Sequence, residues 1–355
     1  MRNTARSVLD LLLDRDNREM MKQILSYSDL VFQGVRDGKE AAETLDMDSE
    51  EVSEIIWYGM GASGIIGEYI GTYLKYSVTR QDIDIFVART YEKVHDDAFY
   101  VFYSYSGNTY EVLKALKEIL EEKNTRRILT FSTGGMMLEL AKKHDIPHIR
   151  LPEGFVSRSH FPYGLALATT ILAKIFRIRN MVEDLKTTIS TIGERILADS
   201  RDISNAKIIN LLAKRISKKI VVIIADYKLK PVAKRFIAQL NENAKHFGAF
   251  FEVPEGCHNF IVGLRNMRKN CFGIILRRTS EDDILKLYMD SIERVINGMD
   301  SIKFTINDEE FCWKTLLEPT YLADILSVFL ADVKGEKSFD IEEITILKRM
   351  ISRGA

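Results

Sequence analysis

Short apolar runs alternate with amphipathic segments along most of this chain. Four β-rich runs occur in the first part, at 55–59, 83–88, 99–103 and 127–132, with helical periodicity between them. A second series begins at Lys219, with strands expected at 219–225, 248–252, 271–276 and 302–305 and helices at 204–217, 229–240 and 281–297. Because strands that alternate with helices form parallel sheets, the pattern predicts two α/β halves.

Helical spacing fills the segments around these two series. After Pro152 an apolar stripe over Leu165–Ile175 and a second stretch over Met181–Leu197 predict two helices, and Lys314–Leu330 and Ile341–Ile351 predict two more. We therefore expect N-terminal helices and a first α/β domain over 1–152, a helical linker over 153–200, a second α/β domain over 201–310 and C-terminal helices over 311–355.

Composition narrows the class of protein. The 355 residues include 50 Lys and Arg, 51 Asp and Glu and 46% hydrophobic residues, which is typical of a globular protein without a general attraction for nucleic acid or membranes. The longest uncharged apolar run, Phe161–Ala173, is shorter than the roughly 20 residues that cross a bilayer. The N-terminal apolar patch Val8–Leu13 is too short for a signal peptide, so we expect a cytoplasmic protein. Three widely spaced cysteines, Cys257, Cys271 and Cys312, indicate free thiols.

The first strand runs into the glycine-rich turn Gly59-Met60-Gly61-Ala62-Ser63-Gly64, which precedes a helix. Glycines allow a tight turn that presents backbone N–H groups beside the positive helix end, where an anion binds well. The same letters fit the GxGxxG dinucleotide fingerprint, whose next strand should end in an acidic residue. Strand 83–88 ends at Arg89 instead, a residue that suits the 2′-phosphate of NADP. A turn that merely packs a helix on a strand is a third interpretation.

A second turn, Ser104-Tyr105-Ser106-Gly107-Asn108-Thr109, lies directly between strand 99–103 and the next helix. Hydroxyl groups and unpaired backbone N–H groups at a helix N-terminus make a cradle for phosphate that needs no lysine. Helix capping alone explains one or two such hydroxyls, whereas Ser104, Ser106 and Thr109 are three within six residues.

These two turns together resemble the sugar isomerase (SIS) domain, a flavodoxin-like module that binds phosphosugars. Further motifs are similar to those of the archaeal bifunctional phosphoglucose/phosphomannose isomerases, over nearly the whole chain. They are Ser132-Thr133-Gly134-Gly135, Leu138–Ala141, Pro152-Glu153-Gly154-Phe155 with Arg158, Asn241-Glu242-Asn243-Ala244-Lys245 and His258-Asn259. The resemblance implies two SIS domains with parallel sheets flanked by helices.

The chemistry of the paired motifs agrees with that resemblance. Aldose–ketose isomerisation needs one group for ring opening and a second group to move a proton between C2 and C1, and Glu242 and His258 supply two such groups. A solvated glutamate and an exposed histidine are the plain alternatives. Zinc binding at Cys257-His258 is a weaker alternative, since adjacent ligands do not match common zinc spacings.

The resemblance assigns roles residue by residue and implies a homodimer in which His258 is donated across the interface. It assigns the proton shuttle to Glu242, ring opening to His258 and Lys348, and stabilisation of the enediolate to Arg158. No metal or redox cofactor is implied. The expected substrate-binding residues are Gly61, Ala62, Ser63, Ser104, Ser106 and Thr109.

Several positions depart from the family pattern. Ser157 replaces a usual proline, Ser159-His160 replaces small apolar residues, and Ala62 replaces a second glycine. Ile341, seven residues before Lys348, stands where a polar residue is usual, so we expect weaker use of mannose 6-phosphate unless Ser338 or Thr345 takes over that space. Two other functions stay open: a phosphosugar-binding regulator on the same fold, and an NADP-dependent oxidoreductase.

Overall fold

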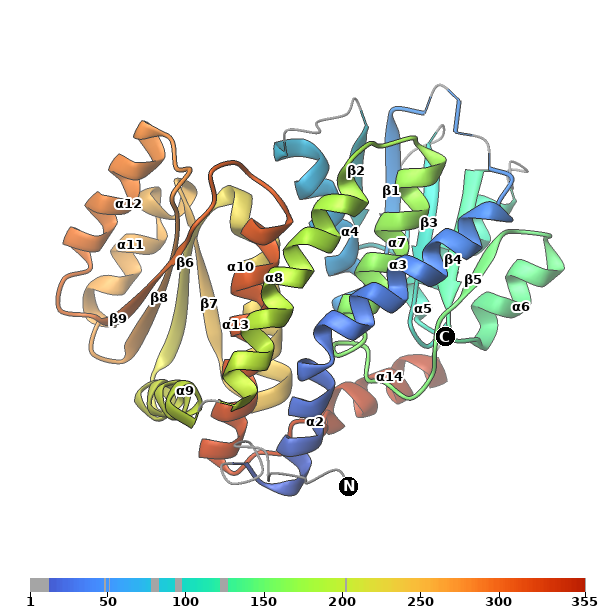
Figure 1. Cartoon of the computed structure of the whole chain (residues 1–355). Coiled ribbons are helices and arrows are strands. Elements are labelled where there is room, and N and C mark those ends of the chain that lie inside the picture. Colours follow the sequence, from blue (N-terminus) through green and yellow to red (C-terminus); the bar gives the residue numbers. More distant parts are fainter. Residues whose placement is uncertain are drawn as a thin grey trace, which may run out of the picture. The chain divides into compact units, whose positions relative to one another are not determined.

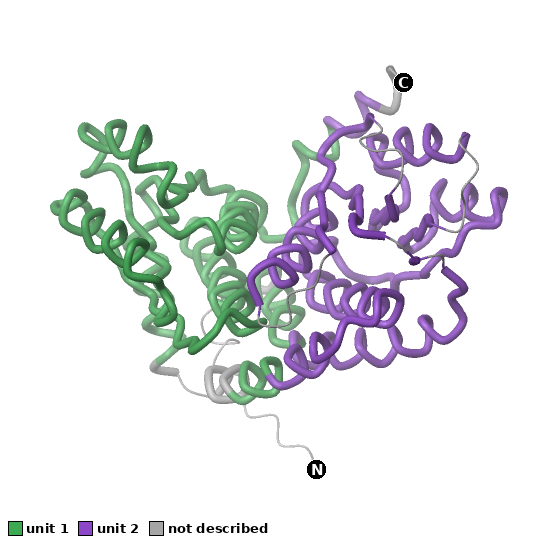
Figure 2. The backbone as a smooth tube through the Cα atoms, turned by 90° about the horizontal axis from the view of Figure 1, so that it is seen from above, with its two compact units in different colours: residues 1–26, 188–346 green, residues 27–187, 347–355 purple. Residues whose placement is uncertain are grey.

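The computed structural model describes residues 13–354, apart from 48, 51, 78–82, 93–97, 122–126 and 202. The N-terminal patch Val8–Leu13 therefore lies almost entirely outside the described residues. The chain folds into two compact units that are both discontinuous in sequence (Figure 2). We call residues 27–187 and 347–355 the first unit (purple, unit 2 in the key of Figure 2) and residues 1–26 and 188–346 the second unit (green, unit 1 in that key).

The unit of residues 27–187 is built on a parallel five-stranded sheet with the order β2-β1-β3-β4-β5 (Figure 1). The sheet explains the first series of apolar runs, because β3 and β4 are buried along their whole length. Its strands are β1 (Glu54–Tyr58), β2 (Asp84–Ala88), β3 (Phe99–Tyr103), β4 (Ile128–Ser132) and β5 (His148–Arg150).

Helices cover both faces of this sheet. Alternate residues of β1 and β3 such as Ile56 and Phe102 pack against α5 and α6, whereas Trp57 stacks on Tyr103 on the opposite face, with ring centroids 5.7 Å apart. On that opposite face α7 packs against α3 and α4. The helices are α3 (Tyr27–Glu43), α4 (Ala62–Tyr76), α5 (Tyr110–Leu120), α6 (Gly135–Lys143) and α7 (Phe161–Ile175), followed by the start of α8 (Met181–Arg201).

The unit of residues 188–346 repeats the plan with a parallel four-stranded sheet in the order β7-β6-β8-β9. Its strands are β6 (Ile220–Asp226), β7 (Gly248–Val253), β8 (Cys271–Arg278) and β9 (Asp300–Ile306). Helices α10 and α13 lie on one face and α11 and α12 on the other (Figure 1). The helical elements are α9 (Ile203–Ile216), η2 (Tyr227–Leu229), α10 (Lys230–Ala244), η3 (Glu255–His258), α11 (Phe260–Gly263), η4 (Leu264–Asn266), α12 (Asp283–Val295), α13 (Trp313–Lys334) and the start of α14 (Glu342–Gly354).

The N-terminal helix α2 (Arg15–Leu25) belongs to this second unit and packs on α13. Met20, Met21 and Ile24 form its buried face. Asn17 is fully buried, and its Oδ1 accepts hydrogen bonds from the backbone N–H (3.1 Å) and the hydroxyl (2.6 Å) of Ser338. The first described helix is thus fixed to residues more than 300 positions later in the chain.

The expectation of two α/β halves with parallel sheets is confirmed, and each predicted strand is present to within two residues. Strand β5 was not predicted, because three residues are too few to show a period. The compact units group the chain differently from the expected sequence segments, since 153–187 belong with the first sheet and the described residues 13–26 with the second.

Candidate functional site

The glycine turn after β1 forms the first wall of the candidate site. The backbone N–H groups of Ser63 and Gly64 donate to Met60 O at 3.1 and 3.4 Å, and Gly61 has a φ of 53°. A Cβ on Gly64 would lie 2.2 Å from Gly59 O, so this close turn needs glycine. Gly61 is exposed and Ala62 half-buried, whereas Ser63 is only 5% exposed. Gly61 and Ala62 are therefore the accessible part of this turn.

Arg89, the residue that suggested NADP, is engaged with the glycine turn itself. Its guanidinium forms an ion pair with Glu68 at 2.8 Å and donates to Gly61 O at 3.5 Å. A guanidinium already paired in this way braces the turn. Binding a 2′-phosphate there would require it to exchange these partners, which counts against the oxidoreductase interpretation.

The hydroxyl-rich turn after β3 forms the second wall. The Oγ atoms of Ser104 and Thr109 lie 2.8 Å apart, and Ser106 Oγ accepts from the backbone N–H of Asn108 at 3.3 Å. Gly107 has a φ of 68°, and a Cβ there would lie 1.8 Å from Gly134 O. Thr109 is the N-cap residue of α5, yet its side chain makes no capping hydrogen bond. The hydroxyls are thus collected at a helix N-terminus without being used to cap it.

The two turns lie at the same edge of the first sheet. β1 and β3 are adjacent and parallel, and both turns follow the carboxyl ends of their strands. β1 is also the strand at which the order reverses between β2 and β3, the position where open α/β sheets bind ligands. The structure therefore brings together the predicted substrate-binding residues of the two turns.

Arg158 lies in the same unit, in the segment that follows β5. Arg158 is only 3% exposed, so its side chain is held inside the fold and not on an open surface. Three of the departures from the family pattern, Ser157, Ser159 and His160, lie in the turn that precedes α7. The Ser159 hydroxyl and the His160 backbone N–H donate to Val156 O at 3.0 and 3.1 Å, while Ser157 is exposed.

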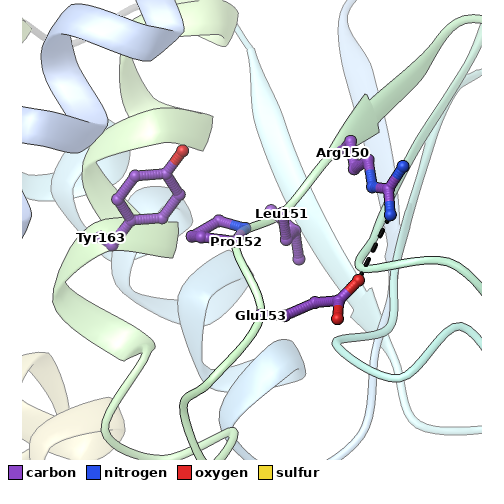
Figure 3. Close-up of a pocket in the computed structure, with 5 residues that line it drawn as sticks. All are labelled: Arg150, Leu151, Pro152, Glu153 and Tyr163. Atoms are coloured by element: carbon purple, nitrogen blue, oxygen red, sulfur yellow. Dashed lines mark hydrogen bonds and ion pairs between the residues drawn. The ribbon is translucent and has the colours of Figure 1, made fainter.

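An open depression of about 420 Å³ lies beside this segment (Figure 3). Arg150 and Glu153 form an exposed ion pair at 3.2 Å on its rim, and Tyr163 of α7 lines the opposite side. The Tyr163 hydroxyl donates to Asp37 at 3.0 Å. These groups satisfy one another, and we assign no ligand to the depression.

Glu242 belongs to the second unit and lies in the last turn of α10. The sequence placed Glu242 after a helix ending at 240, and this is wrong, because α10 continues to Ala244. Its neighbour Asn243 is fully buried and donates to Ser327 of α13 at 2.9 Å, which holds the last turn in place. Lys334 then donates to the carbonyls of Ala244 and Lys245 at 2.8 and 2.7 Å and so satisfies the helix end.

Helix α10 is also fixed along its length by buried charge. Arg235 and Asp324 form an ion pair at 2.7 Å in which both side chains are no more than 3% exposed. Gln239 donates to the second carboxylate oxygen of Asp324 at 2.7 Å. These contacts with α13 fix the part of α10 that carries Glu242.

His258 is exposed and ends the short 3₁₀-helix η3, so the loop predicted there is partly helical. Helix α10 runs back along the sheet to the amino edge, where β7 begins, and His258 follows the carboxyl end of β7. The six residues of β7 span roughly 20 Å at 3.3 Å per residue. Glu242 and His258 of one chain therefore lie near opposite edges of the second sheet.

Lys348 is exposed on α14, in the part of that helix that is grouped with the first unit. Ile341 directly precedes α14, and its carbonyl accepts from the Thr345 hydroxyl at 3.2 Å. Ser338 is fully buried against Asn17. Ser338 cannot take over the space at Ile341, and the Thr345 hydroxyl already bonds to the backbone.

Among the described residues, no group of three or more His, Cys, Asp or Glu side chains is arranged to hold a metal ion. Cys257, Cys271 and Cys312 are free thiols, as the sequence predicted. No helix within the described part of the chain is long and apolar enough to cross a membrane.

Sequence reasoning missed the structural roles of Tyr105 and Asn108, which lie inside the predicted turn, and of Lys334, which lies in no motif. Asn108 Oδ1 accepts from Met136 N at 2.9 Å and so connects the turn to α6.

Comparison with known proteins agrees with this arrangement. A family model described as the bacterial phospho-glucose isomerase C-terminal SIS domain matches residues 207–351. A D-glucosamine-6-phosphate 4-epimerase from Sulfolobus acidocaldarius is 27% identical over 68% of this chain and 74% of its own length. A bifunctional phosphoglucose/phosphomannose isomerase from Aquifex aeolicus is 26% identical over 88% of this chain and 95% of its own length. The enzyme of that name from Aeropyrum pernix is 29% identical over 80% and 83%.

Solved structures show the same fold at low sequence identity. A hypothetical protein from Thermus thermophilus has a TM-score of 0.74 and 12% identity, covering 97% of this chain and 94% of that chain. The C-terminal domain of glucosamine-fructose-6-phosphate aminotransferase from Francisella tularensis has a TM-score of 0.63 and 16% identity, covering 94% and 98%. The resemblance noted from the motifs is confirmed: residues 207–351 match an SIS-domain model, and most of the chain is similar to proteins named bifunctional phosphoglucose/phosphomannose isomerase.

Proposed function

We propose that this protein is an aldose–ketose isomerase that interconverts glucose 6-phosphate with fructose 6-phosphate and, more weakly, mannose 6-phosphate. The observation that carries the proposal is the turn Ser104–Thr109, where uncapped helix N-terminal groups and three hydroxyls meet at the switch point of the first sheet. A phosphate monoester is the anion that such a turn suits. Relatives named as phosphosugar isomerases over most of this chain give the reaction class.

In the proposed reaction Ser104, Ser106 and Thr109 bind the phosphate, with Gly61, Ala62 and Ser63 along the sugar. Glu242 moves the proton between C2 and C1, and Arg158 stabilises the negative charge of the enediolate. His258 and Lys348 assist ring opening. The proposal retains the cytoplasmic location expected from the sequence.

We infer that His258 acts in the site of a partner chain in a homodimer. The support is the topology of the second sheet, because roughly 20 Å of β7 separates the ends that carry Glu242 and His258. Proton transfer needs each group within hydrogen-bond reach of one substrate. Two groups near opposite edges of one sheet cannot both meet that requirement around the same six-carbon sugar.

A coupled assay with glucose, mannose and fructose 6-phosphates tests the activity directly. Glu242→Gln preserves shape but removes the base, so turnover should fall at least about 10²-fold while phosphosugar still binds. Glu309→Gln, the same change at an exposed glutamate of the same unit, serves as the matched control and should retain full turnover. Near-normal turnover by Glu242→Gln would refute the proton-shuttle role.

Mixing two inactive variants tests the shared site. Chains with Glu242→Gln and chains with His258→Ala are unfolded and refolded together in equal amounts. If His258 crosses the dimer, half of the dimers are mixed and each contains one intact site, so activity recovers to about a quarter of wild type. Absence of recovery, with mixed dimers present, refutes the shared site.

A second activity is tested by a separate incubation, because one relative is named a D-glucosamine-6-phosphate 4-epimerase. Glucosamine 6-phosphate is incubated with the protein, and the configuration at C4 is followed by NMR. Epimerisation without aldose–ketose exchange would replace the proposed function. A protein that binds phosphosugars and changes none of them would be the regulator.

A further inference from the structure

One tyrosine joins the phosphate turn to the segment that carries Arg158. The Tyr105 hydroxyl donates to Pro152 O at 3.1 Å and accepts from the backbone N–H of Phe155 at 3.1 Å. The backbone carbonyl of Tyr105 accepts from Thr133 N at 2.9 Å, so its main chain is held as well. Tyr105 lies between Ser104 and Ser106, while Pro152 and Phe155 lie in the segment that leads to Arg158.

The ring of His160 completes this connection. Its centroid lies 4.8 Å from that of Tyr105 and 6.0 Å from that of Phe155, so it packs against both ends of the link. His160 is 1% exposed, and its Nε2 has no hydrogen-bond partner within the described part of the chain. The contacts that the imidazole makes with Tyr105 and Phe155 are therefore packing contacts.

Burial also fixes the chemical state of both groups. It raises the pKa of Tyr105, so the phenol keeps its proton and remains able to donate to Pro152 O. It lowers the pKa of His160 to about 3, so the ring is a neutral aromatic group at physiological pH. Neither group carries charge that would compete with Arg158 for the substrate.

We propose that Tyr105 is a positioning residue that couples the phosphate turn to Arg158, so that a substrate held by its phosphate meets the guanidinium at the place where negative charge develops. The proposal deepens the isomerase function and rests on it for the role of Arg158. Tyr105 touches no reacting atom in this scheme; it acts through the segment Pro152–Phe155. A mutation away from the reacting atoms that misplaces a catalytic group by about 1 Å is enough to slow a reaction strongly.

Tyr105→Phe removes the hydroxyl and keeps the ring against His160. Loss of two hydrogen bonds, each of ordinary strength, should lower kcat about tenfold while KM for fructose 6-phosphate stays within about twofold. Tyr163→Phe is the matched control. It removes one hydroxyl from another ring that packs on His160 at 5.1 Å, and kcat should stay within about twofold.

A binding measurement separates this proposal from the proposed function. Calorimetry on the full chain compares inorganic phosphate with a phosphorylated aldonic acid, whose carboxylate mimics the charge of the enediolate. Tyr105→Phe should leave phosphate affinity within about twofold and weaken the aldonate about tenfold. In an Arg158→Lys background the same change should add less than about twofold, because the residue through which Tyr105 acts is already altered.

The outcomes are distinct. A wild-type chain that turns over no phosphosugar refutes the isomerase function, and the aldonate comparison then decides the coupling on its own. Equal weakening of phosphate and aldonate, or additive losses in the double variant, overturns the coupling. Equal effects of Tyr105→Phe and Tyr163→Phe on kcat also overturn it, since both variants would then report only a loosened fold.

Discussion

Replacing His160 should change how the stability of the first unit depends on pH. The folded imidazole has a pKa lowered to about 3 because it is buried, whereas an unfolded histidine titrates near about 6.5. Between these values the unfolded chain binds a proton that the folded chain does not, so the free energy of unfolding falls as the pH falls below about 6.5. Above about pH 7 both states are neutral and this contribution is absent.

The size of the effect follows from the two pKa values. The excess of protons bound by the unfolded chain, integrated from pH 7.5 to pH 5.0, is about 1.5. The wild type therefore loses about 2 kcal/mol of its free energy of unfolding over this interval. His160→Phe keeps an aromatic ring in contact with Tyr105 and removes the titrating group. Its free energy of unfolding should therefore fall about 2 kcal/mol less over the same interval, whatever its absolute stability.

The two tryptophans make this measurable for one unit. Trp57 is buried in the first unit and Trp313 in the second. In a Trp313→Phe background, urea unfolding followed by fluorescence reports only on the unit that contains His160. His148, whose pKa is also lowered by burial, remains in both proteins and cancels in the comparison. Equal losses in His160→Phe and its parent would refute the argument.

Three further results are expected. Gly107→Ala places a Cβ 1.8 Å from Gly134 O at a left-handed φ, so phosphosugar affinity and melting temperature should both fall by calorimetry, whereas unchanged values would refute the need for glycine. Asp324→Leu leaves Arg235 charged and buried and should cost about 3–5 kcal/mol by denaturant unfolding, while adding Arg235→Met should restore most of it; equal losses in both variants would contradict the pairing. Ile341→Thr should raise kcat/KM for mannose 6-phosphate relative to glucose 6-phosphate, and mannose use by the parent that equals its glucose use would contradict the proposed weakening.

The hydroxyl-rich turn after β3 was predictable because its signals are local. Hydroxyls, glycines and the change from strand to helix all lie within a few residues of one another around Ser104–Thr109. The fold class followed from the alternation of periods along the chain in the same way. In both cases the residues that form the sequence pattern are also the residues that form the structural element.

Other features depend on contacts between distant residues. The polar run Asn241-Glu242-Asn243 suggests a helix end, yet Asn243 is buried against Ser327 and the helix continues. The hydroxyl of Tyr105 bonds to residues about 50 positions away, which no local period reveals. A single sequence contains the donors and acceptors but does not show which distant pairs meet.

The early position of α2 has a consequence for synthesis on the ribosome. Its partners on α13 and its bonding partner Ser338 are made about 300 residues later, after the whole first sheet and the second. Until then Met20, Met21 and Ile24 have no native surface to cover, although residues 27–187 already contain a complete five-stranded sheet. Folding of the second unit therefore cannot finish before α13 and Ser338 are made, and until then the apolar face of the amphipathic α2 segment lacks these partners.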